Sequence, residues 1–199
     1  MIDTQVRQII DKPLTYCAKQ LGARGISADQ VTFFGFSLGF IAGGAIMLGL
    51  MGLAFILILL SRLCDGLDGS LARLNGATDR GAFLDISLDF LFYSWIPLSF
   101  AVHDPQNALA ASFLIFTFIG TGTSFLSYAA IAEKRGIDPA AKGQKGIYYL
   151  GGLTEGTETI IFLLVICVWP SLFSLCACLF GLLCLMTTAI RIYRGYQDF

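Results

Sequence analysis

The chain has 199 residues, of which 56% are hydrophobic and 14% are charged, and its formal net charge at pH 7 is −1. Soluble globular domains carry about 25% charged residues, so this composition argues against a soluble domain and predicts a polytopic, all-α membrane protein. A net charge near zero also gives no reason to expect a nucleic-acid partner. The apolar segments leave no room for a separate soluble domain, so residues 1–199 are predicted to form a single membrane domain.

Residues 1 to about 25 mix charged and apolar side chains. The apolar residues recur at steps of three or four from Ile2 to Leu21. This spacing predicts an amphipathic helix that lies on the membrane surface and is interrupted near Pro13. Charged residues such as Asp3 and Arg7 exclude the continuous apolar core of a cleavable signal peptide.

Six apolar segments follow, and each is about as long as a helix that crosses a bilayer. In this six-span arrangement all 13 lysines and arginines fall on one side of the membrane. The positive-inside rule then places both termini, and the connection between the second and third spans, in the cytoplasm. The expected six-helix bundle covers residues 31–193, with spans at 31–48, 51–72, 79–102, 106–132, 146–169 and 171–193.

The segment 64–89, CDGLDGSLARLNGATDRGAFLDISLD, carries five aspartates in the middle of this apolar chain. Within it, residues 74–78, LNGAT, predict a turn, because Asn75 and Gly76 can end one helix and Thr78 or Asp79 can cap the next. We therefore expect a helical hairpin that bends at this turn and carries acidic side chains on both arms.

Four of these aspartates fall at matched distances from the turn. Asp68 and Asp85 each lie seven residues from it, which at a rise of 1.5 Å per residue places them about 10 Å away. Asp65 and Asp89 lie ten and eleven residues from it, at about 15 Å. Steps of three and four residues keep each pair on one helix face, so the hairpin would bring two carboxylates to face two others.

An ionised carboxylate within a membrane span costs on the order of 2.5 to 3.5 kcal/mol, and four together also repel one another. Divalent cations would offset both costs. A ligand set of oxygens without histidine or thiolate favours Mg²⁺ or Mn²⁺ and also admits Ca²⁺, and two ions about 3.5 to 4 Å apart would form a clamp suited to displacement at phosphorus. The alternative is that the acids line a hydrated vestibule or pair with Arg62, Arg73 and Arg80.

Small residues lie beside the aspartates on both expected helices. Gly69 and Ala72 each follow an aspartate by four residues, and Gly81 precedes Asp85 by four. Their missing or short side chains would let a nucleotide or diphosphate approach the ions, although small residues also serve close helix packing in membranes. Arg73 could pair with a phosphate group or anchor the end of the span.

The residues from 65 to 89 resemble the signature of the CDP-alcohol phosphotransferase (CDP-alcohol phosphatidyltransferase) family, D-x2-D-G-x2-A-R followed by G-x3-D-x3-D. The spacer between the two halves has seven residues here, one fewer than in the usual pattern. The segment 148–159, YYLGGLTEGTET, is similar to a bacterial inner-membrane subgroup of that family rather than to a branch with a settled substrate. Eight residues match the signature: Asp65, Asp68, Gly69, Ala72, Arg73, Gly81, Asp85 and Asp89.

This resemblance implies an enzyme of phospholipid biosynthesis. It would transfer a substituted phosphoryl (phosphatidyl) group from a CDP-linked donor, usually CDP-diacylglycerol, to an alcohol and release CMP. The resemblance also implies a homodimer in the bacterial cytoplasmic membrane, with Asp89 as the base for the acceptor hydroxyl. It assigns the remaining roles as follows: Asp65, Asp68, Asp85 and Asp89 would hold Mg²⁺ or Mn²⁺, and Gly69, Ala72, Arg73 and Gly81 would line the CDP site.

The acceptor alcohol is less well defined by the sequence. Glu155 and Glu158 lie three residues apart in the fifth expected span, so they would share a helix face. They could belong to an acceptor pocket that binds hydroxyls or an amine, or they could be internal partners of Arg191. A competing function, a transporter or ion pathway, would also use acids within the membrane, but it predicts acids spread across the bilayer instead of gathered at one end.

Overall fold

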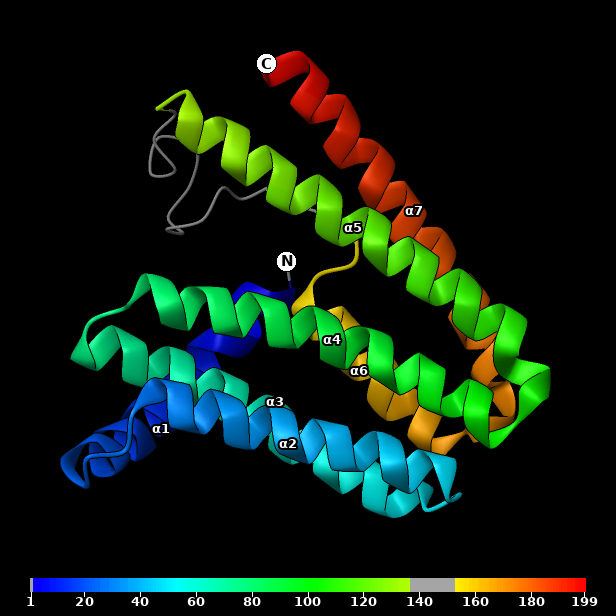
Figure 1. Ribbon diagram of the computed structural model, residues 1–199, viewed down its shortest axis with the longest axis horizontal. Helices are drawn as coiled ribbons and strands as arrows, with labels where there is room; N and C mark the ends of the chain where they lie inside the picture. Colours follow the sequence, from blue (N-terminus) through cyan, green and yellow to red (C-terminus); the bar gives the residue numbers. More distant parts are fainter. Residues whose placement is uncertain (1, 137–152) are drawn as a thin grey trace.

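The computed structural model describes residues 2–136 and 153–199, with side chains from residue 11 onward. These residues form α-helices joined by short turns and contain no β-strand, which confirms the all-α prediction. Figure 1 shows the helices lying alongside one another, with α5 and α7 on one side of α4 and α2 on the other. In chain order the elements are α1 (Ile2–Ala23), α2 (Ala28–Met47), α3 (Met51–Asn75), α4 (Asp79–His103), the 3₁₀ turn η1 (Pro105–Asn107), α5 (Ala108–Lys134), α6 (Gly156–Val168), the 3₁₀ turn η3 (Pro170–Leu172) and α7 (Phe173–Asp198).

Helices α3 and α4 form the hairpin that the sequence predicts. α3 ends at Asn75, and Gly76 follows with φ of 96°, a left-handed conformation that residues with a side chain rarely adopt. Thr78 then caps α4, because its Oγ1 accepts a hydrogen bond from the backbone N–H of Gly81 at 3.0 Å. The two helices, each of 25 residues, are antiparallel and are joined by this turn.

Helix α2 packs against both arms of this hairpin. Ser27 is the N-cap residue of α2, and it forms a capping box with Gln30 in the first turn. Two glycines of α2 allow a close approach: a Cβ on Gly39 would lie 2.5 Å from the ring of Phe92 in α4, and one on Gly35 would lie 2.8 Å from Cys64 in α3. Because these positions have no side chain, both arms fit against the α2 backbone, and α2 sets the distance between them.

The remaining helices complete the core around the hairpin. α5 packs against α4 and along α7, while α1 and α6 lie against α3. Stacked rings join α7 to α4 and α6: the ring centroids of Phe100 and Phe173 lie 4.5 Å apart, as do those of Phe162 and Phe180. The acid-bearing arms are therefore held by a continuous apolar core.

Within residues 2–136 and 153–199, four helical segments are long and apolar enough to cross a membrane: α2, α4, residues 105–134 and residues 170–198. α3 has 25 residues but carries Arg62 near its middle and Asp65 and Asp68 in its second half, and α6 has 13 residues. Large apolar side chains such as Phe116 and Leu179 are exposed on the outside of the bundle, as expected for surfaces that contact lipid.

Two expected helix boundaries are wrong. α1 continues through Pro13, where the sequence predicts an interruption, because the helix is supported by packing against α3 and α6. In the fifth expected span, residues 146–152 lie outside the described residues, but residues 153–155 are not helical and α6 begins at Gly156. The other expected spans agree with the observed helices to within one or two turns.

Candidate functional site

Acidic side chains of α3 and α4 meet across the space between the two arms. Asp65 of α3 and Asp85 and Asp89 of α4 each offer one carboxylate oxygen, and these oxygens all lie within 4.8 Å of one another. A Mg²⁺ ion with oxygen ligands at about 2.1 Å separates opposite ligands by about 4.2 Å. Small side-chain rotations would therefore enclose an ion, and the donor set fits a hard divalent cation.

Asp68 belongs to the same region but is held by a different contact. Its Oδ2 accepts a hydrogen bond from Oγ1 of Thr32 on α2 at 2.6 Å, and the residue is only 4% exposed. Together with the three clustered aspartates it lines one small cavity between α2, α3 and α4. The sequence does not single out Thr32, because only the packing of α2 against α3 brings it to an aspartate 36 positions away.

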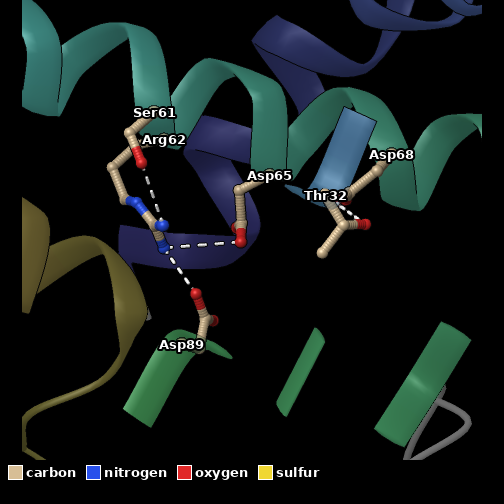
Figure 2. A network of polar contacts seen from close by, with 6 residues as sticks. All are labelled: Thr32, Ser61, Arg62, Asp65, Asp68 and Asp89. Atoms are coloured by element: carbon tan, nitrogen blue, oxygen red, sulfur yellow. Dashed lines mark hydrogen bonds and ion pairs between the residues drawn. The ribbon is translucent and has the colours of Figure 1, made fainter. Parts of the chain in front are cut away.

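Arg62 lies at the end of this cluster that is farther from the hairpin turn (Figure 2). Its Nη1 lies 2.6 Å from Oδ1 of Asp89 and 3.4 Å from Oδ1 of Asp65. Ion pairing was one of the alternatives that the sequence left open, and it is present for these two aspartates. Four carboxylates still outnumber one guanidinium, so the cluster keeps an excess of negative charge that divalent cations would offset.

A cavity of about 400 Å³ opens beside the cluster, between the start of α2, the end of α3 and the start of α4. Asp68 and Asp85 form part of its wall, so it adjoins the acidic cluster directly. Three of the four residues expected at a CDP site, Gly69, Ala72 and Gly81, also line it. A nucleoside diphosphate that binds in this cavity with its phosphate groups toward the cluster would place them next to Asp68 and Asp85.

Arg73, the fourth residue expected at a CDP site, is not among the residues that line this cavity, but it lies next to Gly69, which does line it. Its Nη1 is 3.6 Å from the position that a Cβ on Gly69 would take. Its Nη2 donates a hydrogen bond to Oγ of Ser70 at 2.9 Å and lies 3.8 Å from the carboxylate of Asp11 on α1. The side chain is 57% exposed, so it has room to turn toward a ligand.

Glu155 and Glu158 do not share the helix face that the sequence predicts. Glu155 is the N-cap residue of α6 and lies outside the helix, and Oε2 of Glu158 accepts a hydrogen bond from the backbone N–H of Glu155 at 3.2 Å. Glu155 is therefore not on a helix face, because α6 begins only at Gly156, but the capping box keeps it in contact with Glu158. Glu155 also attracts the guanidinium of Arg191 on α7, in agreement with the internal-partner alternative. Neither glutamate is among the residues that line the two cavities.

Known proteins resemble this chain over nearly its whole length. The family model for CDP-alcohol phosphatidyltransferase matches residues 26–192. The Escherichia coli inner membrane protein YnjF is 49% identical over 197 residues, which cover 98% of this chain and 96% of that protein. A phosphatidylinositol phosphate synthase from Streptomyces avermitilis is 31% identical over 172 residues, which cover 83% of this chain and 66% of that protein.

The fold is also similar to that of a phosphatidylinositol phosphate synthase from Mycobacterium tuberculosis. Its crystal structure with CDP-DAG bound has a TM-score of 0.72 at 23% identity and covers 92% of this chain and 93% of that chain. Its structure in complex with manganese and citrate has the same TM-score of 0.72 and covers 92% of this chain and 88% of that chain. The helix arrangement in Figure 1 is thus one that occurs in solved structures.

Proposed function

Because the chain belongs to the CDP-alcohol phosphatidyltransferase family, we propose that it transfers a phosphatidyl group from CDP-diacylglycerol to an alcohol and releases CMP. One observation carries this proposal: carboxylates from α3 and α4 converge beside a cavity of about 400 Å³. This volume lies within the range of about 300 to 1,000 Å³ that small-molecule sites occupy.

The four aspartates would hold Mg²⁺ or Mn²⁺, most simply as a pair of ions. When bound, these cations neutralise the diphosphate and stabilise the departing CMP. Asp89 acts as the base: it accepts the proton of the acceptor hydroxyl while that oxygen bonds to the lipid-linked phosphorus and the bond from this phosphorus to CMP breaks. Structures of the M. tuberculosis synthase with CDP-DAG and with manganese support the choice of donor and ion.

The cavity beside the cluster would hold the CDP group. Gly69, Ala72 and Gly81 keep its walls free of large side chains. Arg73 would turn from Ser70 toward a phosphate oxygen, because its side chain is exposed and lies next to Gly69 of the cavity wall. The acyl chains of the donor would remain in lipid, since the site lies between helices whose outer surfaces are apolar.

Replacing Arg73 by alanine is expected to raise the KM for CDP-diacylglycerol at least about tenfold, because a charge-assisted hydrogen bond to phosphate contributes about 1.5 to 3 kcal/mol. Initial rates of CMP release at varied donor concentration measure this change. Lys134→Ala, which removes an exposed positive charge from the end of α5, serves as the control and should leave the KM unchanged. An unchanged KM in Arg73→Ala would show that Arg73 only anchors the end of α3.

Glu155 and Glu158 are the candidate residues of the acceptor site, as acceptors of hydrogen bonds from hydroxyls or an amine. Arg191, which Glu155 attracts electrostatically, offers a cation to an acceptor that carries a phosphate group. The S. avermitilis relative is a phosphatidylinositol phosphate synthase, so phosphorylated and neutral polyols are both suitable candidates.

We further propose six membrane spans, with α1 on the cytoplasmic surface and both termini and the aspartates at the cytoplasmic side. The placement of all lysines and arginines on one side of the six-span arrangement supports this orientation. α3 and the segment that contains α6 would be the two spans beyond the four apolar ones. The membrane would be a bacterial inner membrane, as for the E. coli relative, and the protein is expected to be a homodimer.

The decisive experiment combines purified full-length protein, CDP-diacylglycerol, Mg²⁺ or Mn²⁺ and a panel of alcohols that includes glycerol phosphate and inositol phosphate. CMP release measures the reaction, and the mass of the lipid product identifies the acceptor. We expect CMP release that requires both the metal and one class of alcohol. Release of no CMP with any acceptor would instead favour a transporter or ion pathway.

A further inference from the structure

Arg62 places a permanent positive charge beside the acidic cluster. It lies one helical turn before Asp65 on α3, on the same helix face (Figure 2). Its side chain is only 7% exposed, and the guanidinium carbon lies 4.1 Å from the ring centroid of Phe92 and 5.7 Å from that of Tyr93. Both rings favour a cation at this position, and a guanidinium does not lose its proton in proteins.

The hydrogen bonds of Arg62 are incomplete. One nitrogen, Nη1, is shared between Asp89 and Asp65, while Nη2 donates to Oγ of Ser61 at 3.3 Å. The third nitrogen, Nε, is buried and has no hydrogen-bond partner within the part of the chain that the structure describes. A guanidinium can bind a carboxylate through two parallel hydrogen bonds, and here it does not. Arg62 is therefore held close to the aspartates without the strongest form of pairing.

A divalent cation would require the carboxylates that Arg62 now contacts. Asp65 and Asp89 both belong to the group of three aspartates whose oxygens lie within 4.8 Å of one another. Since Nη1 of Arg62 lies 2.6 Å from Oδ1 of Asp89, a cation bound at that oxygen would come within a few ångströms of the guanidinium. Like charges at such a distance repel strongly where water is largely excluded.

We propose that Arg62 is a built-in counter-ion of the metal centre, which holds Asp65 and Asp89 together when no cation is bound and competes with the cation for them. This inference rests on the metal centre of the proposed function. It predicts that Arg62 lowers the affinity for the cation while it stabilises the metal-free fold. It also implies that Asp89 leaves Arg62 when the cation binds, so that the base becomes available together with the metal.

The test measures binding of Mn²⁺ to the full-length protein in detergent, from the electron paramagnetic resonance signal of free Mn²⁺. Arg62→Met, which keeps an unbranched side chain about as long as the aliphatic part of arginine and removes the charge, should bind Mn²⁺ at least about tenfold more tightly than the original protein. Its thermal midpoint should fall without metal and return close to the original value with saturating Mn²⁺. Arg62→Lys, which keeps the charge, should bind Mn²⁺ within about threefold of the original protein.

Arg135→Met is the matched control. Arg135 is the exposed C-cap residue of α5, so this variant loses one positive charge on a helix that carries none of the four aspartates and should keep the original affinity for Mn²⁺. In the Asp89→Asn background, the gain from Arg62→Met should shrink, because one of the two contested carboxylates is already neutral. A gain of unchanged size in that background would overturn competition at Asp89.

The remaining outcomes separate this inference from the proposed function. If the original protein binds Mn²⁺ and Arg62→Met binds it equally or more weakly, Arg62 orients the ligands and the inference is wrong, while the metal centre stands. If Arg62→Lys binds as tightly as Arg62→Met, charge is not the cause and the inference is also wrong. Should Arg62→Met not fold, Arg62→Gln provides the same comparison with a smaller polar side chain. Failure of the original protein to bind Mn²⁺ would overturn the metal centre itself.

Discussion

Replacement of Asp89 by asparagine is expected to lower metal-dependent CMP release at least about a thousandfold. Asparagine has the size of aspartate, but it cannot accept the proton of the acceptor hydroxyl, and general-base catalysis contributes about 10²- to 10⁴-fold to such reactions. The change also removes a carboxylate from the group of three whose oxygens lie within 4.8 Å of one another. Initial rates with CDP-diacylglycerol and saturating Mn²⁺ measure the loss.

Asp79→Asn is the matched control for this variant. Asp79 is the first residue of the same helix and is exposed, so its neutralisation should change the rate by less than about twofold, as is usual for surface sites. If Asp89→Asn keeps more than a tenth of the original rate, Asp89 is not the base and another group must take the proton.

Gly69→Leu is expected to reduce kcat/KM for the donor at least about a hundredfold while Mn²⁺ binding remains unchanged. Gly69 lines the cavity of about 400 Å³, and a Cβ there would contact one atom within 4 Å, Nη1 of Arg73. The chain should therefore fold with the larger side chain, which would occupy the space that the diphosphate needs. Displacement of a substrate by about 1 Å can already cost about a hundredfold.

Gly52→Leu provides the control on the opposite end of α3. A Cβ on Gly52 meets nothing within 4 Å, and the residue is exposed, so this variant should keep the original kcat/KM. Donor turnover by Gly69→Leu at the original rate would mean that CDP binds outside this cavity. Measurement of Mn²⁺ affinity in both variants separates loss of the donor site from loss of the metal site.

The positions of the aspartates on the hairpin could largely be predicted from the sequence. Counting residues from the turn predicted that Asp65, Asp85 and Asp89 would meet, and their oxygens do lie together. The same count placed Asp68 in this cluster as well, but its carboxylate accepts a hydrogen bond from Thr32 of α2. Residue counting assumes two straight helices in contact, whereas α2 packs against both arms and offers a hydroxyl to one of them.

Arg62 and Glu155 show where sequence reasoning left alternatives open or failed. The sequence offered three arginines as partners for the acids, and rotamers and ring packing bring the guanidinium of Arg62 to Asp65 and Asp89. A spacing of three residues suggested one helix face for Glu155 and Glu158. The capping box that begins α6 removes Glu155 from the helix, and a capping interaction depends on the local backbone path more than on spacing.

The sequence by itself determined the membrane character, the helical hairpin and the family, because apolar length, turn chemistry and the spacing of the aspartates are local properties. Tertiary structure alone decided that Asp68 hydrogen-bonds to Thr32 and that Arg62, rather than Arg73 or Arg80, pairs with Asp65 and Asp89. These features depend on the distance between helices that are remote in sequence. Here that distance is set by the contact of α2, through its glycines, with both arms of the hairpin.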